Sequence, residues 1–364
     1  MLGRGGFAVD LFERDRFPRE KPCGEGLMPA GVAALDRLSL RETVGGAPFV
    51  GVRYHSGSLV AEGRFPPIHG QPSTGIGQRR WRLDEVLFNV AATTNGVRAR
   101  MGCPVSRPLV EFGRVVGCEV EGRPVRASLV VAADGLHSRL RSALGLDAPL
   151  ARHVRVGLRT HFRLAPGREQ PPWVEIFLGH RHELYVTPLP DREVLVAGLA
   201  ARDSLRRDAR AALRDWIRAQ PALAERLQGA VQLSPIAGRS PLSQDASCGV
   251  APGAVLLGDA AGFLDPISGG GMAQGLLTAE LLAGYITRYL SAGDAWLWEF
   301  ERERRQMLRD YRLLTQAMLL LARHPRAAHL SLALLRFLPA AFDHLVGVAG
   351  GTRHLGWHDD FDGP

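Results

Sequence analysis

The sequence predicts a three-layer α/β fold, a mostly parallel sheet between helices, with a smaller antiparallel α+β region inserted into it. Residues 128–133 and 254–258 are short, continuous apolar runs, typical of strands buried on both faces of a parallel sheet. Apolar and polar residues alternate over 49–65, and turn residues divide 154–200 into about four strands, 154–164, 173–179, 182–188 and 193–200, which predicts antiparallel pairing. Helices are expected at about 203–219 and 221–229, followed by a strand near 231–237. The length of 364 residues is sufficient for two such regions.

The composition excludes several classes of protein. Hydrophobic residues make up 46% and charged residues 23% of the chain, which excludes a disordered or collagen-like protein. The four cysteines show no metal-ligand spacing, so we expect no metal site, no disulfide framework and a reducing compartment. The net charge is +8, but Lys21 is the only lysine and the arginines are dispersed. Nucleic-acid binders concentrate their charge, so we expect no nucleic-acid partner.

Apolar stretches are limited in length. No segment reaches the roughly 18 uninterrupted apolar residues of a spanning helix. No charged and then apolar leader begins the chain, and we expect a cytoplasmic protein. Residues 296–348 predict two or three helices with apolar faces. These helices either pack against the rest of the fold, or cover an apolar substrate or contact a membrane surface.

The N-terminal residues predict the end of a helix followed by a strand. Gly5 and Gly6 precede the apolar run 7–12, which Glu13 closes. In a dinucleotide-binding βαβ unit, an acidic residue ends the second strand about 20 residues after the glycine fingerprint. Glu13 fits that position, although a surface glutamate at a strand end fits equally well.

Two loops contain candidate ligand-binding residues. In the segment Lys21-Pro-Cys-Gly-Glu-Gly, Gly24 and Gly26 allow the backbone to approach a flat or phosphorylated group, or form a plain turn. The strand 128–133 leads into Asp134 and Gly135, which places a carboxylate at the ligand-bearing edge of the sheet. The following Ser138 and arginines could also cap and solvate a helix.

The segment 254–290 has the most specific pattern. A buried strand at 254–258 is followed by Asp259, Pro266 and the three glycines 269–271, and then by an apolar helix over 272–290. The carboxylate of Asp259 can accept hydrogen bonds from ligand hydroxyls. The glycines expose the N-terminus of the helix, where unpaired N–H groups favour a negatively charged ligand.

These motifs, in this order, resemble the FAD-dependent aromatic-hydroxylase-like superfamily. It includes single-component monooxygenases, geranylgeranyl reductases and flavin-dependent halogenases. The resemblance covers about residues 7–290, and the KPCGEG loop is most similar to the geranylgeranyl-reductase-like branch. It implies a Rossmann-like FAD-binding domain and NAD(P)H as the reductant.

The resemblance also implies site residues. Glu13 would bind the adenosine ribose, Asp259 the ribityl or phosphate region, and Gly271 and Met272 the pyrimidine end of the flavin. Asp134 would contribute to both FAD and NAD(P)H binding. The full set of implied cofactor contacts is Glu13, Arg14, Cys23, Gly24, Gly26, Arg80 (or Arg79), Val105, Asp134, Gly135, Gly258, Asp259, Pro266, Gly270, Gly271 and Met272.

The resemblance divides the chain into interleaved parts. The FAD-binding domain would comprise 1–48, 76–148 and 245–300, the substrate domain 49–75 and 149–244, and a C-terminal helical region 301–364. The antiparallel sheet would cover the flavin and form the substrate pocket. Tyr185 would face that pocket and is the weak catalytic candidate, although a packed strand aromatic is the alternative.

The implied activity is that of an NAD(P)H-dependent monooxygenase that acts on an apolar or aromatic small molecule through a flavin hydroperoxide. The alternatives are reduction of isoprenoid double bonds, and a non-catalytic remnant of the fold. The family's first strand and GxGxxG turn are missing. The first glycine of that turn is expected about 20 residues before Glu13, and that position lies upstream of Met1. We therefore expect on the order of 15 further residues upstream, and an unstable or FAD-poor chain without them.

Overall fold

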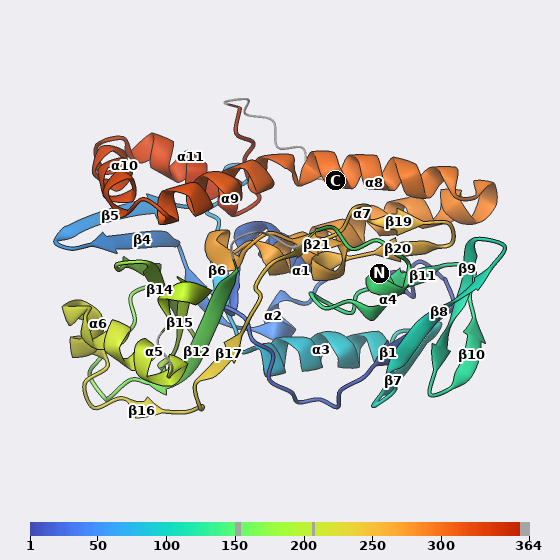
Figure 1. Cartoon of the computed structure of the whole chain (residues 1–364), viewed down its shortest axis with the longest axis horizontal. Helices are drawn as coiled ribbons and strands as arrows, with labels where there is room; N and C mark the ends of the chain where they lie inside the picture. The colour runs from blue at the N-terminus through green and yellow to red at the C-terminus, as the bar shows by residue number, and fades with distance from the viewer. Residues whose placement is uncertain (150–153, 206–207, 357–364) are drawn as a thin grey trace.

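The structure is a computed structural model that describes residues 1–149, 154–205 and 208–356 (Figure 1). The buried apolar runs form the expected strands, in two separate pieces of sheet. In one piece, β1 (Val9–Glu13) pairs in parallel with β7 (Val97–Met101). In the other, β11 (Val130–Ala132) pairs in parallel with β20 (Ala254–Leu256), which pairs with β19 (Val250–Ala251). The expectation of a further strand upstream of Met1 stays a prediction.

Helices and small sheets surround these strands. The helices are α1 (Pro29–Arg37), α2 (Arg41–Val44), α3 (Arg80–Ala92), α4 (Arg139–Ala143) and α7 (Gly271–Ala292). An antiparallel meander contains β8 (Val105–Glu111), β9 (Arg114–Val120) and β10 (Arg123–Arg126). Two small sheets join β2 (Gly26–Leu27), β6 (Gly75–Gly77) and β3 (Ala47–Phe49), and β18 (Gln244–Asp245) and β21 (Gly262–Phe263).

The inserted region forms one large sheet. Its strands, in spatial order, are β16 (Val231–Gln232), β12 (Arg155–Arg163), β15 (Glu193–Ala201), β14 (His182–Pro188), β13 (Val174–Leu178), β4 (Gly51–Ser56) and β5 (Leu59–Arg64), and β17 (Ala237–Arg239) also pairs with β12. The expected hairpin and the four strands over 154–200 are confirmed. The expectation of purely antiparallel pairing is wrong at one place, because β4 belongs to the separate hairpin and runs parallel to β13.

Two further sequence predictions need correction. The single strand expected near 231–237 is divided into β16 and β17, because Pro235 between them has no N–H to donate to a strand ladder. The helix expected at 203–219 is a short 3-10 helix, η1 (Arg202–Ser204), and then α5 (Ala209–Arg218). Residues 206–207 of that prediction lie outside the described residues. Helix α6 (Pro221–Arg226) follows α5, as expected.

The C-terminal region contains four helices in its described part rather than two or three. They are α8 (Ala295–Met307), α9 (Arg309–Ala322), α10 (Pro325–Phe337) and α11 (Pro339–Ala349). Pro325 and Pro339 each stand at a helix start, where a proline is favoured and the preceding helix cannot continue through it. Residues 357–364 of the expected region 301–364 lie outside the described residues.

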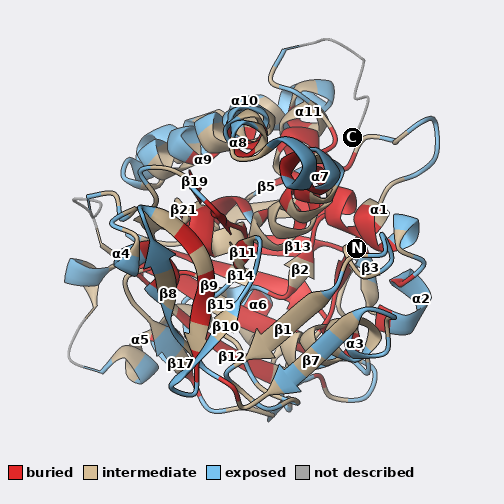
Figure 2. Cartoon of the chain, turned by 90° about the vertical axis from the view of Figure 1, so that its right-hand side faces the viewer, coloured by how far each residue is buried: buried red, intermediate tan, exposed pale blue. Residues whose placement is uncertain are grey.

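The large sheet has an apolar core on each side. One core cluster joins it to α1, the start of α7, and the inner faces of α10 and α11. The other joins it to α5 and α6. Figure 2 shows that the buried residues lie between these layers, while the outer faces of the C-terminal helices are largely exposed.

Candidate active site

The start of α7 is the centre of the candidate site. The 3-10 helix η3 (Pro266–Ser268) leads into it, and no side chain caps the first turn of α7. A Cβ atom would lie 2.8 Å from Met28 Cε at Gly269, 2.4 Å from Tyr311 Cε2 at Gly270 and 2.9 Å from Phe263 Cε2 at Gly271. A side chain at Gly270 or Gly271 would have to displace an aromatic ring, and Gly269 has φ +74°, so all three positions favour glycine and no side chain covers the backbone N–H groups there.

Tyr311, on α9, was not predicted from the sequence. Its ring packs on Gly270. Burial raises the pKa of this phenol, and Ser268, the Gly270 backbone and Thr315, which lie beside the hydroxyl, oppose that shift. The first turn of α7 itself presents N–H groups without a side-chain cap and no acidic side chain, which suits an anionic ligand.

Asp259 lies in a second turn beside α7. The 3-10 helix η2 (Gly258–Ala261) begins at Gly258, whose φ of +56° favours glycine, and a Cβ built there would be in van der Waals contact with the Gly275 Cα of α7 at 3.9 Å. The half-buried carboxylate of Asp259 forms no hydrogen bond or ion pair with any other residue that the structure describes. It is therefore available to a ligand.

Lys21 links Asp259 to the other predicted motifs. Its Nζ lies 3.9 Å from the position of a Cβ at Gly135. Burial and the nearby Arg80 lower the pKa of Lys21, while Asp259 and Asp84 oppose that shift. The structure thus brings the KPCGEG loop, the Asp134-Gly135 turn, Arg80 and Asp259 into one electrostatic environment.

Glu25 holds the KPCGEG loop in place. Its carboxylate is fully buried, accepts from the backbone N–H of Arg80 at 3.0 Å and lies 2.8 Å from His161 Nε2. Thr187 donates to the Gly24 carbonyl oxygen at 2.8 Å. No atom lies within 4 Å of a Cβ built at Gly24, so one side of the loop stays open. The sequence analysis missed Glu25 because it treated the loop only through its glycines and Cys23.

Arg141 was also missed. The sequence left open that the arginines after Ser138 only cap and solvate α4, and for Arg141 that interpretation is wrong. Its side chain is 2% exposed and donates to the carbonyl oxygens of Ala260 at 3.0 Å and Leu136 at 2.9 Å. It therefore fixes the η2 turn that bears Asp259. Ser138 does cap α4, by accepting from Arg141 N.

Other predicted residues have protein partners in this structure. Asp134 Oδ2 accepts from the N–H groups of Arg139 at 2.9 Å and Leu140 at 3.3 Å. Arg80 donates twice to Asp84, at 2.8 and 2.9 Å. Asp134 therefore stabilises the start of helix α4, and Arg80 stabilises helix α3.

The residues predicted to bind the adenosine end of FAD lie on or beside strands that belong to other sheets than β20, the strand before Asp259. Glu13 ends β1, where it accepts from Asp15 N at 3.0 Å and from Arg19 at 3.3 Å. Arg14 is mostly exposed, and Val105 begins β8. The cofactor roles of these three residues stay predictions.

Tyr185 is part of a buried network behind the glycine turn. Its hydroxyl donates to the Ile267 carbonyl oxygen at 3.2 Å. Arg155 donates to Asp265 at 2.7 Å and to Glu183 at 2.7 Å. Asp265 in turn accepts from Ile267 N at 3.0 Å. These contacts connect strands β12 and β14 to η3, so Tyr185 positions the turn, and a catalytic role for it stays a prediction.

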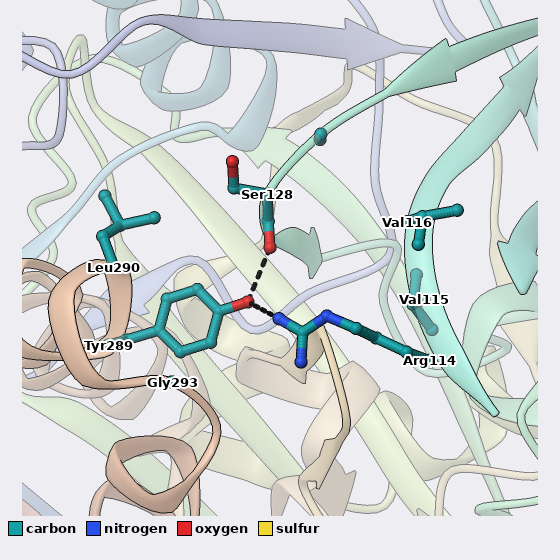
Figure 3. Close-up of a pocket in the computed structure, with 8 residues that line it drawn as sticks. Arg114, Val115, Val116, Ser128, Tyr289, Leu290 and Gly293 are labelled. Carbon is teal, nitrogen blue, oxygen red and sulfur yellow. Dashed lines mark hydrogen bonds between the residues drawn. The ribbon is translucent and has the colours of Figure 1, made fainter. Parts of the chain in front are cut away.

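A separate pocket of about 380 Å³ lies at the other end of α7 (Figure 3). Its lining includes Arg114, Ser128 and Tyr289. Arg114 donates to the Tyr289 hydroxyl at 2.7 Å, and this hydroxyl donates to the Ser128 carbonyl oxygen at 2.6 Å. None of the lining residues is a predicted site residue. Among the described residues, no group of three or more metal-ligating side chains is present.

The sequence matches the family described as FAD dependent oxidoreductase over residues 86–285. The chain belongs to this family. It is 30% identical over 318 residues to menaquinone reductase from Mycolicibacterium smegmatis, a match that covers 81% of this chain and 76% of the relative. A structure of a flavoprotein/dehydrogenase from Cytophaga hutchinsonii superposes with a TM-score of 0.83 at 20% identity, covering 96% of this chain and 88% of that one. The expected fold class and superfamily are therefore confirmed.

Two further relatives match with different coverage. Digeranylgeranylglycerophospholipid reductase from Methanoculleus marisnigri is 31% identical over 204 residues, which is 51% of this chain and 48% of the relative. Squalene monooxygenase from Mus musculus is 26% identical over 307 residues, which is 77% of this chain and 51% of the relative. The chain thus spans about half the length of each of these two relatives.

The glycine turn can be tested by substitution. We expect Gly270→Ala to lower flavin content, because the added methyl group collides with the Tyr311 ring and displaces the α7 N-terminus. Gly284→Ala, in the same helix, is the matched control, since nothing lies within 4 Å of its Cβ. It should retain flavin and gain about 0.5–1 kcal/mol of stability. The measurements are flavin absorbance per protein and thermal unfolding. Equal flavin content in both variants would contradict the assignment.

The buried Asp265 predicts a pH-dependent stability. Burial raises the pKa of its carboxyl to about 6, although Arg155 opposes this shift. The folded protein therefore binds the proton of Asp265 more tightly than the unfolded chain does, whose Asp pKa is about 4. The proton stabilises the fold fully below pH about 4, and this stabilisation is lost as the pH rises through about 6. We expect Asp265→Asn to remove this decline, as measured by urea unfolding across that range. Asp215→Asn, on the exposed side of α5, should keep the wild-type slope.

Proposed function

We propose that this flavoprotein uses NAD(P)H to reduce a carbon–carbon double bond in the isoprenoid chain of an apolar lipid. The observation that carries the proposal is the 30% identity, over 81% of the chain, to menaquinone reductase. The digeranylgeranylglycerophospholipid reductase supports it, because the geranylgeranyl chains in its name are isoprenoid chains. The overall reaction consumes NAD(P)H and a proton, and it saturates one double bond.

The described residues fit FAD at the start of α7. The unpaired N–H groups of the first turn suit the anionic end of a reduced flavin. The free carboxylate of Asp259 suits ribityl hydroxyls, and the open side of Gly24 leaves room for a flat ring. FAD supplies the redox chemistry when bound, so the chain itself needs no nucleophile or metal for it.

The side chains near the start of α7 suit an apolar substrate. Met28 and Met272 belong to the core cluster that also contains Tyr54 and Tyr185 on the large sheet. The cluster continues to Leu335 on the inner side of α10. We infer that the isoprenoid chain lies between the sheet and the C-terminal helices, where these side chains exclude water.

Oxygen-dependent hydroxylation or epoxidation is the second candidate. The match to squalene monooxygenase over 77% of this chain favours it. Both candidates share the FAD site and an apolar isoprenoid substrate. They differ in whether molecular oxygen is consumed.

Product analysis under nitrogen and under air distinguishes the two. We expect protein reconstituted with FAD to oxidise NADH or NADPH under nitrogen and to convert menaquinone to a product that carries two additional hydrogens in its isoprenoid side chain. After reoxidation of the quinone ring the two hydrogens should remain, which separates this product from the quinol. Air should not be needed. A product that gains oxygen, formed only in air, would replace our proposal with the monooxygenase. Protein that includes the expected upstream strand and glycine turn and still cannot retain FAD would contradict both candidates.

Asp259 should contribute to cofactor affinity. We expect Asp259→Ala to weaken FAD binding by about ten- to a hundredfold, since hydrogen bonds to a charged group contribute about 1.5–3 kcal/mol. Asp215→Ala, on the exposed surface of α5, should leave the affinity unchanged. Titration of apoprotein with FAD, followed by flavin fluorescence, measures both constants. An unchanged affinity in Asp259→Ala would show that the carboxylate does not contact the cofactor.

A further inference from the structure

The outer sides of α9 and α10 expose large apolar side chains. Phe337 is 78% exposed, Leu330 67% and Leu334 61%. Twelve large apolar side chains are exposed among the described residues, and half of them lie in α9, α10 and the residue after α10. These six are Leu313, Leu320, Leu330, Leu334, Phe337 and Leu338. Monomeric proteins rarely expose so many together, and such a group marks an interaction surface.

The spacing places these side chains on one face of each helix. Leu330, Leu334 and Phe337 follow an i, i+4, i+7 pattern in α10, and Leu313 and Leu320 are seven residues apart in α9. Leu332, on another side of α10, is buried in the core cluster that contains Phe342. The inner side of α10 therefore already has its packing partner, and the exposed stripe is additional.

The charge around the stripe is positive. Residues 311–342 contain four arginines and no aspartate or glutamate. The exposed side chains of Arg323, Arg326 and Arg336 form no ion pair or hydrogen bond with another residue that the structure describes. Elsewhere many arginines are paired with carboxylates, as Arg312 is with Asp245. An apolar stripe bordered by unpaired arginines is complementary to a lipid surface that carries negative charge.

The geometry favours a helix that lies on a membrane. No single helix in the described part of the chain is long and apolar enough to cross a bilayer. The pair α10 and α11 passes that test only when combined, and it bends by 115°. Phe342 and Val346 of α11 are buried in the core and contribute nothing to the outer surface. Only the α9–α10 side is available for contact.

We propose that the α9–α10 surface, formed by the six exposed apolar side chains with Arg323, Arg326 and Arg336, docks on the face of an anionic bilayer. The inference deepens the proposed function, on which only its purpose rests: docking would hold the enzyme on the bilayer that contains an isoprenoid lipid substrate, with α10 between the bilayer and the core of the protein. The same core cluster connects Leu335 of α10 to Met272. Docking itself requires no bound flavin.

Vesicle flotation of the full chain tests the proposal. We expect wild-type protein to float with vesicles of phosphatidylcholine and phosphatidylglycerol, and less with phosphatidylcholine alone. The double variant Leu334→Ser/Phe337→Ser should lower partition by about tenfold or more, since each buried apolar side chain contributes about 1.5–3 kcal/mol. Arg326→Gln/Arg336→Gln should lower it by about fivefold per arginine, at about 1 kcal/mol each, with anionic vesicles only.

Phe112→Ser provides the matched control. Phe112 is fully exposed in the turn between β8 and β9, at the opposite end of the molecule from α10 (Figure 1). Its substitution should leave partition unchanged. The docking proposal is wrong if wild-type protein does not float with anionic vesicles, or if Phe112→Ser lowers flotation as much as the α10 variant. It is also wrong if the α10 substitutions instead dissociate a dimer that does not bind vesicles.

Activity separates this proposal from the proposed function. The α10 variant should retain wild-type turnover of a short-chain substrate that dissolves in water, and lose turnover of the same headgroup embedded in vesicles. Normal flotation without any turnover would contradict the proposed function and leave docking supported. Turnover of embedded substrate that does not depend on the α9–α10 surface would contradict docking and leave the proposed function supported.

Discussion

The arrangement of the site depends on one packing constraint, the close approach of Met28, Tyr311 and Phe263 to the three glycines 269–271 at the start of α7. Met28 directly precedes α1, Tyr311 lies on α9 and Phe263 on β21, so two distant segments and the neighbouring strand fix one turn. No side chain can cover the N–H groups there, because the space it would need is already filled. A helix N-terminus that is both exposed and rigid is the physical requirement for holding negative charge without reorganisation.

Buried charges keep this turn and its neighbours in register. Glu25 connects the KPCGEG loop to the start of α3 and to His161 on the large sheet, and Arg141 connects α4 to the Asp259 turn. Arg155 bridges Asp265 and Glu183, so the large sheet and the glycine turn cannot move independently without exposing or separating buried charges. The apolar cluster on the same side of the sheet then extends to the C-terminal helices, whose outer sides expose the apolar stripe that we propose docks on a lipid surface.

The sequence predicted most of the architecture, since strands such as 182–188 and turns such as Gly258-Asp259 have local patterns. It failed where one residue decides the outcome, as at Pro235, where a missing N–H divides a strand. It also missed Glu25, Arg141 and Tyr311, because each acts through partners more than fifty residues away or through atoms whose packing no local pattern encodes. Predicted contacts such as Asp134 instead have local capping partners, which compete with a ligand for the same oxygens.

The most direct test of the account is the position of flavin in a crystal structure of the FAD complex. The account predicts that the flavin ring contacts the backbone N–H groups of Gly271 or Met272, with Asp259 beside the ribityl chain and Gly24 against the ring. Flavin bound elsewhere, for example in the pocket lined by Arg114 and Tyr289, would contradict the assignment of the α7 N-terminus as the cofactor site.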